Sequence, residues 1–245
     1  MESVEHPPVI ECCSVTHRFA DGSIGIEDIN LRIHENEAVL FIGPNGSGKT
    51  TLFRHFIGLL VPQRGDVVVD GVSVRENVRR ARERIGMVFQ DADCQIVGET
   101  VGGDVAFGPE NLRLDRTEID IRVSESLKAV GLEGFADRRP HTLSGGEKRR
   151  LAIAGILAMN PRVLVLDEPF ANLDYPGMRS IVAILRQWRD EQRTLIVSSH
   201  QVGALLPLVT RVVLLNGGKI YADGLPVEVL PKAVELGILP PGAMP

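Results

Sequence analysis

A glycine-rich run near the N-terminus has the composition of a phosphate-binding loop. Residues 43–50 match the pattern G-x-x-x-x-G-K-[ST] and stand between an apolar stretch and a predicted helix. Glycines let backbone N–H groups approach phosphate, while the lysine reaches the β- and γ-phosphates and the final hydroxyl binds Mg²⁺. The predicted nucleotide contacts are Gly43, Pro44, Asn45, Gly46, Ser47, Gly48, Lys49, Thr50 and Thr51.

Two adjacent carboxylates end an apolar run further along the chain. Asp167 and Glu168 follow residues 163–166, Val-Leu-Val-Leu, and an α/β sheet binds its ligands at the carboxyl ends of its strands. One carboxylate can be taken up by a metal ion while the other stays free to accept a proton. The alternative for such a pair is an exposed acidic turn.

A third stretch, Leu-Ser-Gly-Gly-Glu over residues 143–147, has the composition of a helix start. Ser144-x-x-Glu147 is a capping box, and it predicts a helix to about Met159. The beginning of a helix carries bare N–H groups and the positive end of the helix dipole, so it attracts an anion. Nothing in its own neighbourhood is a ligand for this anion site.

In this order, the three stretches resemble the motifs of the ATP-binding-cassette (ABC) ATPases, which implies an enzyme that hydrolyses ATP with Mg²⁺. By this resemblance, Asp167 helps to hold Mg²⁺ and Glu168 orients or deprotonates the attacking water. Gln90 matches the glutamine that contacts Mg²⁺ and the water, and His200 matches the histidine that contacts the γ-phosphate. Phe19 takes the place of the aromatic residue that stacks on adenine, with a buried core phenylalanine as the alternative.

The same resemblance implies that two cassettes work together. Ser144, Gly145 and Gly146 would close over ATP held by the phosphate-binding loop of a second cassette. Asp174, in the run Asn172-Leu173-Asp174, matches a loop that crosses the same interface. The partner is therefore expected to be a second copy of this chain or a related chain.

Three further stretches, residues 88–96, 104–112 and 148–155, look like those of the energy-coupling-factor importers. That group implies a membrane-embedded coupling subunit, a substrate-binding membrane subunit and a peripheral place at the cytoplasmic face of the cell membrane. It also implies uptake of cobalt, nickel, biotin or another vitamin. Two departures are visible: Gly102-Gly103 stand where acidic residues are common, and Glu147 stands where glutamine is commoner.

Acidic residues in this region are expected to meet the membrane partner. Asp91, Asp93 and Asp104 would offer an acidic face to basic coupling helices, with solvated surface acids as the alternative.

The main alternative function is a non-transport ABC ATPase that acts on nucleic acid or the ribosome. DNA-repair and chromosome-structure members carry a very long coiled coil between the phosphate-binding loop and the Ser-Gly-Gly motif, but residues 50–143 contain no heptads of that kind. Ribosome-acting members usually carry two cassettes on one chain, and this chain has one. A GTPase would require an Asn-Lys-x-Asp motif, which the sequence lacks.

Composition agrees with a soluble globular protein that does not bind nucleic acid. The 245 residues are 44% hydrophobic and 24% charged, and the formal net charge of −5 provides no global positive field. The basic run 79–84 is interpreted as the solvated face of a helix. Three cysteines without metal-ligand spacing favour a reducing cytoplasm.

The apolar pattern predicts the elements that position these motifs. Strands are expected at residues 9–19, 24–33, 38–42, 66–70, 72–74, 85–90, 163–166, 194–198 and 212–215, and helices at 49–60, 119–130, 144–159, 177–189 and 202–208. Apolar strands that alternate with helices and lack a polar face indicate a parallel sheet covered on both sides.

The predicted fold is an α/β, P-loop ABC-type nucleotide-binding domain with an antiparallel β subdomain and an inserted α-helical subdomain. The domain is expected to span residues 9–230, with the helical subdomain at about 92–160 and a short C-terminal tail at 231–245. Residues 1–8 lack the apolar core of a signal peptide. The sequence contains no apolar stretch long enough to span a membrane.

Overall fold

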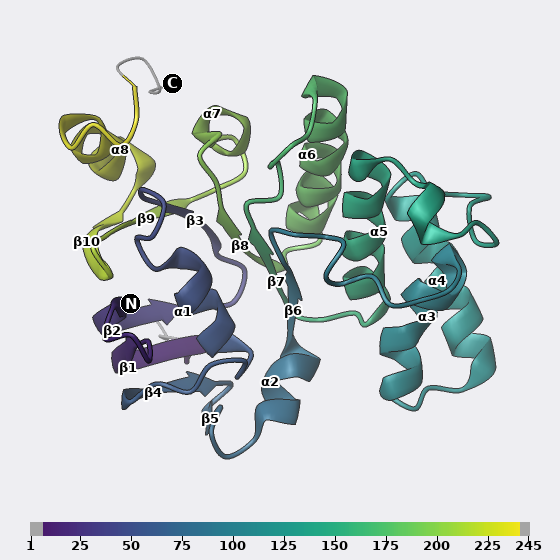
Figure 1. Ribbon diagram of the computed structural model, residues 1–245, viewed down its shortest axis with the longest axis horizontal. Helices are drawn as coiled ribbons and strands as arrows, with labels where there is room; N and C mark the ends of the chain where they lie inside the picture. The colour runs from purple at the N-terminus through teal and green to yellow at the C-terminus, as the bar shows by residue number, and fades with distance from the viewer. Residues whose placement is uncertain (1–6, 241–245) are drawn as a thin grey trace, which may run out of the picture.

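The computed structural model describes residues 7–240, which form two sheets with helices on both sides of the larger one (Figure 1). The strands are β1 (Ile10–Arg18), β2 (Ile24–Ile33), β3 (Ala38–Ile42), β4 (Arg64–Val69), β5 (Val72–Ser73), β6 (Ile85–Val88), β7 (Val163–Asp167), β8 (Thr194–Ser198), β9 (Arg211–Asn216) and β10 (Lys219–Gly224). The helices are α1 (Lys49–Phe56), α2 (Val78–Arg84), α3 (Val101–Asn111), α4 (Arg116–Ala129), α5 (Gly145–Ala158), α6 (Tyr175–Asp190), α7 (Val202–Leu205) and α8 (Pro226–Glu235), with a 3-10 turn at Pro140–Thr142.

The larger sheet has the strand order β10-β9-β3-β8-β7-β6, and every neighbouring pair is parallel except β10 and β9. Its central strands β3, β7 and β8 are buried along their whole length. Alternate residues of β3 belong to different cores: Val39 and Phe41 to one, Leu40 and Ile42 to the other. Because successive side chains of a strand point to opposite faces, both faces of the sheet are covered, as predicted.

The smaller sheet is antiparallel, with the order β2-β1-β4-β5. Helix α1 lies between the two sheets, where Leu52, Phe53 and Phe56 pack with residues of β1, β2 and β4 in a single core. Phe53 also packs edge-on against Phe41 of β3, with the ring centroids 5.1 Å apart. The antiparallel subdomain predicted from the sequence is confirmed.

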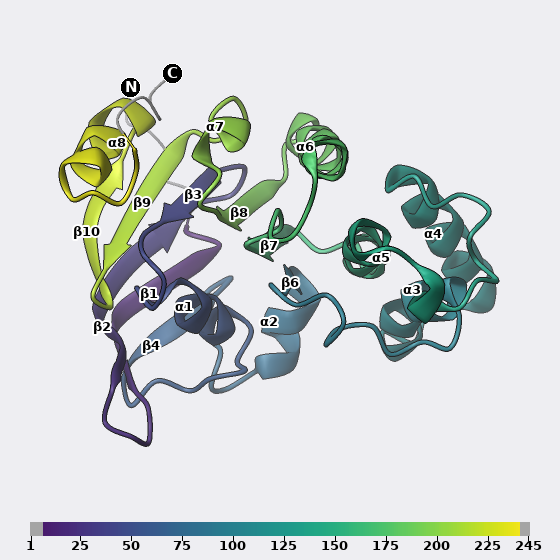
Figure 2. The ribbon, with the colours of Figure 1, turned by 45° about the horizontal axis from the view of Figure 1, so that its top comes forward.

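Helices α3, α4 and α5 form the helical subdomain. Figures 1 and 2 both place them at one end of the molecule, beyond β6, with α8 and β10 at the other end. The hydroxyl of Thr100 caps α3, the carboxylate of Asp115 caps α4, and Ser144 with Glu147 forms the predicted capping box of α5.

Several elements differ from the prediction, among them helix α3, which the predicted helices do not include. Helix α1 ends at Phe56 rather than at residue 60, because Gly58 adopts a left-handed φ of 62° and Leu59 N bonds back to Arg54 O. Strand β10 was not predicted, although the Gly217-Gly218 pair that turns the chain into it is a hairpin signal. Helix α8 also spans residue 231, where the tail was predicted to begin. Residues 241–245 of that tail lie outside the described residues.

Candidate functional site

The phosphate-binding loop connects the end of β3 to the start of α1, and close backbone contacts require glycine at two of its positions, Gly43 and Gly48. A Cβ on Gly43 would stand 2.1 Å from Leu215 O, and one on Gly48 would stand 2.5 Å from Gly25 O. Both glycines have positive φ angles, 148° and 103°, which side chains disfavour. The loop therefore presents bare backbone at the N-terminus of α1, the arrangement that suits phosphate.

Lys49 is held in the middle of this loop. Its ammonium group donates to Gly43 O at 2.8 Å and to Pro44 O at 3.3 Å, and the residue is 7% exposed. Burial lowers the pKa of Lys49, while the nearby carboxylates of Glu168 and Asp167 act to raise it. A partly desolvated cation within the loop would attract phosphate oxygens more strongly than a cation in water.

Asp167 connects the phosphate-binding loop to the end of β7, where the two adjacent carboxylates lie. Its two oxygens accept hydrogen bonds from Thr50 Oγ1 at 2.5 Å and from Ser198 Oγ at 2.6 Å, and the residue is 1% exposed. The contacts arise because β7 pairs with β8 and places Asp167 opposite Ser198. Residues far apart in sequence thus meet at the carboxyl edge of the sheet.

The oxygens of Thr50 and Asp167 suit a Mg²⁺ ion whose remaining ligands would be phosphate oxygens and water. Thr50 and Asp167 provide a hydroxyl and a carboxylate, the hard donors that Mg²⁺ prefers. Within residues 7–240, no group of three or more His, Cys, Asp or Glu side chains is arranged to hold a metal ion. Mg²⁺ usually binds through one or two protein groups plus phosphates and water, so this donor set suits it. Ser47 Oγ, buried without a hydrogen-bond partner, adds an unsatisfied polar atom beside the site.

Glu168 adopts a left-handed backbone conformation, with φ 46°. Its N–H is held by the backbone oxygen and the hydroxyl of Ser198, at 3.2 and 2.9 Å. The carboxylate meets His200, with Oε1 3.3 Å from Nε2 and Oε2 accepting from the backbone N–H at 3.3 Å. His200 Nε2 also lies 3.1 Å from Asn45 Oδ1. The proposed base is therefore connected to the phosphate-binding loop through the histidine.

These residues surround one open cleft of about 550 Å³, a size typical of small-molecule sites. Its lining comprises Phe19, Ile24, Gly25, Asn45, Gly46, Ser47, Gly48, Lys49, Thr50, Thr51, Gln90, Asp167, Glu168, Phe170, Ala171, Ser199, His200 and Gln201. Phe19 is 40% exposed, which argues against the core alternative, and its ring packs edge-on against His17 at 5.0 Å.

The Ser-Gly-Gly motif lies apart from this cleft. None of Ser144, Gly145, Gly146 and Asp174 is among the cleft's lining residues. Ser144 and Gly145 are exposed, and a Cβ on Gly145 would meet no atom of the described residues within 4 Å. A Cβ on Gly146 would stand 3.7 Å from Leu173, so this motif and the loop before Asp174 are neighbours. The structure thus separates the predicted site residues into two groups.

Comparison with known proteins identifies the family of the chain. The family profile described as ABC transporter matches residues 26–171, more than half of the chain. The chain is 43% identical to the energy-coupling factor transporter ATP-binding protein EcfA of Methanothermobacter thermautotrophicus over 228 residues, which are 92% of this chain and 73% of that one. EcfA of Methanocaldococcus jannaschii is 44% identical over 90% of this chain and 80% of its own.

This chain belongs to the ABC transporter ATP-binding proteins. Within them it is an ATPase of the energy-coupling-factor type.

Two solved cassettes share the fold. The cassette cbiO1 of Clostridium perfringens, described as part of the ABC transporter complex cbiONQ, superposes with a TM-score of 0.82 at 35% identity over 95% of both chains. A second cassette, solved as a dimer in a post-hydrolysis state bound to ADP and Pi, has a TM-score of 0.80 at 28% identity and covers 88% of this chain and 98% of its own. The predicted α/β cassette fold is therefore confirmed.

One prediction for the ATPase is wrong. Asp104 does not contribute to an acidic surface, because it is only 8% exposed and accepts from the backbone N–H groups of Val97 and Gly98 at 2.7 and 2.9 Å. It fixes the loop before α3 instead. Of the other two acids, Asp93 forms an ion pair with Lys148 at 2.6 Å, and Asp91 accepts from Cys94 Sγ at 3.1 Å.

Two supporting side chains escaped the sequence analysis. Ser198 binds both Asp167 and the backbone of Glu168, and only the pairing of β7 with β8 reveals it. Arg149, on α5, is buried and donates to the backbone oxygens of Phe89 and Gln90. It therefore links the helix of the Ser-Gly-Gly motif to the glutamine that lines the cleft.

Proposed function

We propose that this ATPase hydrolyses Mg²⁺–ATP at the interface of two cassettes and thereby drives uptake of a substrate across the cytoplasmic membrane. The observation that carries the proposal is the separation of the exposed, capped start of α5 from the cleft of its own chain. An anion-attracting helix end without a ligand in its own chain is best explained by a nucleotide held in a second chain. The partner is a second copy or a related cassette.

In the proposed reaction, the loop N–H groups and Lys49 bind the phosphates, and Phe19 stacks on the adenine. Thr50, Asp167 and Gln90 would hold Mg²⁺, which neutralises charge on the phosphates and polarises them.

Proton transfer in this proposal belongs to a second set of side chains. Glu168 orients the attacking water and accepts its proton, since its carboxylate is bonded to neither Thr50 nor the P-loop backbone. His200, placed between Glu168 and Asn45, contacts the γ-phosphate and holds the carboxylate in position. Ser144, Gly145, Gly146 and Asp174 act on the nucleotide of the partner cassette.

The proposed assembly contains a membrane-embedded coupling subunit and a substrate-binding membrane subunit. Residues 7–240 include no helix that is both long and apolar enough to cross a membrane. One relative is the ATP-binding protein of an energy-coupling factor transporter and another is a part of the ABC transporter complex cbiONQ, which supports a peripheral place at the cytoplasmic face of the membrane. The proposed substrates are cobalt or nickel, or a vitamin such as biotin.

The proposal predicts that turnover depends on association between cassettes. ATPase rate is measured against protein concentration, and a rise steeper than linear is expected because only the dimer completes a site. The same measurement with the membrane subunits in liposomes tests coupling to uptake. A strictly linear rate at all concentrations, without membrane subunits, would contradict self-association and point to a different partner cassette. Stimulation by nucleic acid or ribosomes instead of membrane subunits would favour the non-transport alternative.

A further inference from the structure

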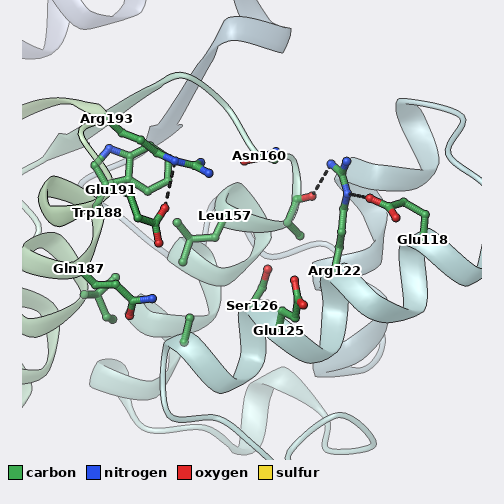
Figure 3. A pocket seen from close by; sticks show the side chains of 13 residues that line it. Glu118, Arg122, Glu125, Ser126, Leu157, Asn160, Gln187, Trp188, Glu191 and Arg193 are labelled. Atoms are coloured by element: carbon green, nitrogen blue, oxygen red, sulfur yellow. Dashed lines mark hydrogen bonds and ion pairs between the residues drawn. The ribbon is translucent and has the colours of Figure 1, made fainter. Parts of the chain in front are cut away.

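An exposed aromatic ring distinguishes the nucleotide cleft from the cavity of about 440 Å³ between α4 and α6 (Figure 3). In that cavity, Trp188 is 4% exposed, the guanidinium group of Arg193 lies 4.7 Å from its ring, and its indole N–H donates to Thr194 O at 3.0 Å. Phe19 of the nucleotide cleft is 40% exposed and follows directly after β1. An exposed ring at the start of a turn keeps a defined position only if its neighbours restrict its backbone and its rotamers.

Gln63 holds the backbone immediately before Phe19. Its side-chain oxygen accepts from the Arg18 N–H at 2.8 Å, and its side-chain nitrogen donates to Arg18 O at 2.8 Å. The backbone N–H of Gln63 donates to Thr16 O at 3.0 Å. Arg18 is the last residue of β1, and Gln63 stands just before β4. The amide therefore extends the hydrogen bonding of the smaller sheet up to the residue that leads into Phe19.

The ring of Phe19 has a neighbour on each of two sides. The imidazole of His17 packs edge-on against it, with the ring centroids 5.0 Å apart. On the other side, a Cβ on Gly25 would stand 2.9 Å from Phe19 Cε2, so the absence of a side chain at this position leaves room for the ring. His17 is buried and is not among the residues that line the cleft. It supports the ring from within the protein.

His17 also connects Phe19 to the helix that follows the phosphate-binding loop. Its ring lies 4.9 Å from that of His55, at an interplanar angle of 73°. His55 Nδ1 lies 2.7 Å from Thr51 O, and it donates this hydrogen bond because a carbonyl oxygen can only accept. Burial lowers the pKa of His55 to about 4, so its ring is neutral at neutral pH. Phe19, His17 and His55 thus form a continuous contact with α1.

We propose that Gln63 and His17 are positioning residues for the nucleobase. Gln63 fixes the backbone that leads into Phe19, and His17 fixes the orientation of the ring relative to α1 and the phosphate-binding loop. Neither residue lines the cleft, so both act through Phe19. A ring that is ordered before the nucleotide arrives does not lose that freedom on binding, which raises affinity for the base but not for the phosphates. This inference rests on the proposed stacking of adenine on Phe19.

The test compares a nucleotide with a ligand that has no base. Calorimetry on the full chain measures the affinity for ATP and for inorganic triphosphate, both with Mg²⁺. Gln63→Ala removes both side-chain hydrogen bonds to Arg18 at an exposed position, and His17→Ala removes the supporting ring. Each should weaken ATP binding about threefold to tenfold, because a stacked base contributes about tenfold or more to affinity. Triphosphate binding should stay within about twofold of the wild-type value.

Three further variants separate positioning from a general effect on the fold. His17→Phe keeps an aromatic edge beside Phe19 and should bind ATP as the wild type does. Gln187→Ala makes the same change as Gln63→Ala at an exposed position of α6. Val69→Ala removes buried volume from the smaller sheet opposite Ile10, at the other end of β1 from Phe19. Neither control should change the ratio of the two affinities.

Phe19→Ala distinguishes failure of this inference from failure of the proposed stacking. If Phe19→Ala weakens ATP binding selectively but Gln63→Ala and His17→Ala do not, the positioning roles are overturned and the stacking stands. If Phe19→Ala leaves the ratio of the two affinities unchanged, the stacking is wrong and the positioning roles are overturned with it. Equal loss of ATP and triphosphate binding in Gln63→Ala and His17→Ala would show a general structural role and would also overturn the inference.

Discussion

Two helices of this ATPase begin at glycine-containing motifs, and their N-termini have different surroundings. Helix α1 starts at Lys49 without a side-chain cap, and Thr50 of its first turn is bonded to Asp167. Helix α5 starts at Gly145, where Ser144 and Glu147 satisfy each other's backbone groups and Gly145 has open space beside it. The first end is surrounded by groups of its own chain, and the second faces outward.

The difference shows which part of the site the chain completes alone. At α1, a loop, a lysine, a hydroxyl and two carboxylates converge on one cleft. At α5, the capping box stabilises the helix end but provides no metal donor or base. The cleft of one chain has the groups that bind a nucleotide, and the start of α5 can bind an anion from another chain. We therefore propose a composite site between two chains.

The largest expected effect separates chemistry from binding within the cleft. Glu168→Gln keeps the shape of the side chain and its contact with the His200 backbone, but removes the proton acceptor. Turnover should fall about a hundredfold or more, whereas ATP affinity should remain within about twofold. Steady-state ATPase rates and equilibrium ATP binding measure the two quantities. Glu133→Gln, exposed in the loop after α4, serves as the charge-matched control. A Glu168→Gln enzyme with wild-type turnover would remove this residue from its proposed role.

The next largest effect is expected at the exposed start of α5. Ser144→Arg places a bulky cation at the start of α5 and should abolish turnover while its own chain still binds ATP. Ser144→Thr, which retains a capping hydroxyl, should retain most activity.

A mixing experiment sharpens this prediction. A chain with Lys49→Ala has a defective loop and an intact Ser-Gly-Gly motif, the reverse of Ser144→Arg. If two copies form the dimer, the mixed dimer contains one intact composite site, and mixing two inactive proteins should restore part of the turnover. No recovery from well-folded variants would argue against pairing between copies of this chain. Loss of ATP binding in Ser144→Arg itself would contradict the partner-facing role.

A smaller effect concerns the support of the carboxylates. Ser198→Ala removes the hydroxyl that binds Asp167 Oδ1 and the Glu168 N–H, leaving a buried carboxylate oxygen with one partner fewer. The free energy of unfolding should fall by about 1–3 kcal/mol. Chemical denaturation measures it, with Ser180→Ala, which removes a half-buried hydroxyl that donates to Pro176 O within α6, as the control. Equal stability of Ser198→Ala and wild type would show that the hydroxyl is dispensable.

Much of the cleft could be predicted because its residues carry local signals. The loop 43–50 has a strict spacing, and Asp167 with Glu168 ends an apolar strand, so both motifs could be placed at the carboxyl edge of one sheet. Their meeting at Thr50 and Asp167 required only that β3 and β7 lie in the same sheet.

Other features depend on contacts between elements that are distant in the sequence, which no local sequence pattern predicts. Asp104 was predicted to lie on an acidic surface, but its carboxylate accepts hydrogen bonds from two backbone N–H groups of the loop before α3. The sequence alone does not show that this loop folds back onto Asp104. Ser198 and Arg149 have roles only because β8 adjoins β7 and α5 packs on β6. The order of strands in the sheet is a tertiary property, so these contacts were not accessible from composition or periodicity.

The smallest expected effect concerns the capping box itself. Hydrogen bonds from the backbone and hydroxyl of Ser144 lower the pKa of Glu147. A lowered pKa means that the carboxylate stabilises the fold above its unfolded pKa and that this stabilisation is lost as the pH falls through the folded pKa. Glu147→Gln keeps the cap without the charge, so it should be less stable at neutral pH by only about 0.3 kcal/mol, given the exposure of the site.

Unfolding free energies of both proteins across the acid range test this: the difference should disappear at low pH. A difference that persists there would mean that the glutamate acts through packing rather than charge. In either case turnover at neutral pH should hardly change, because a glutamine also completes the box and leaves the outward-facing N–H groups in place.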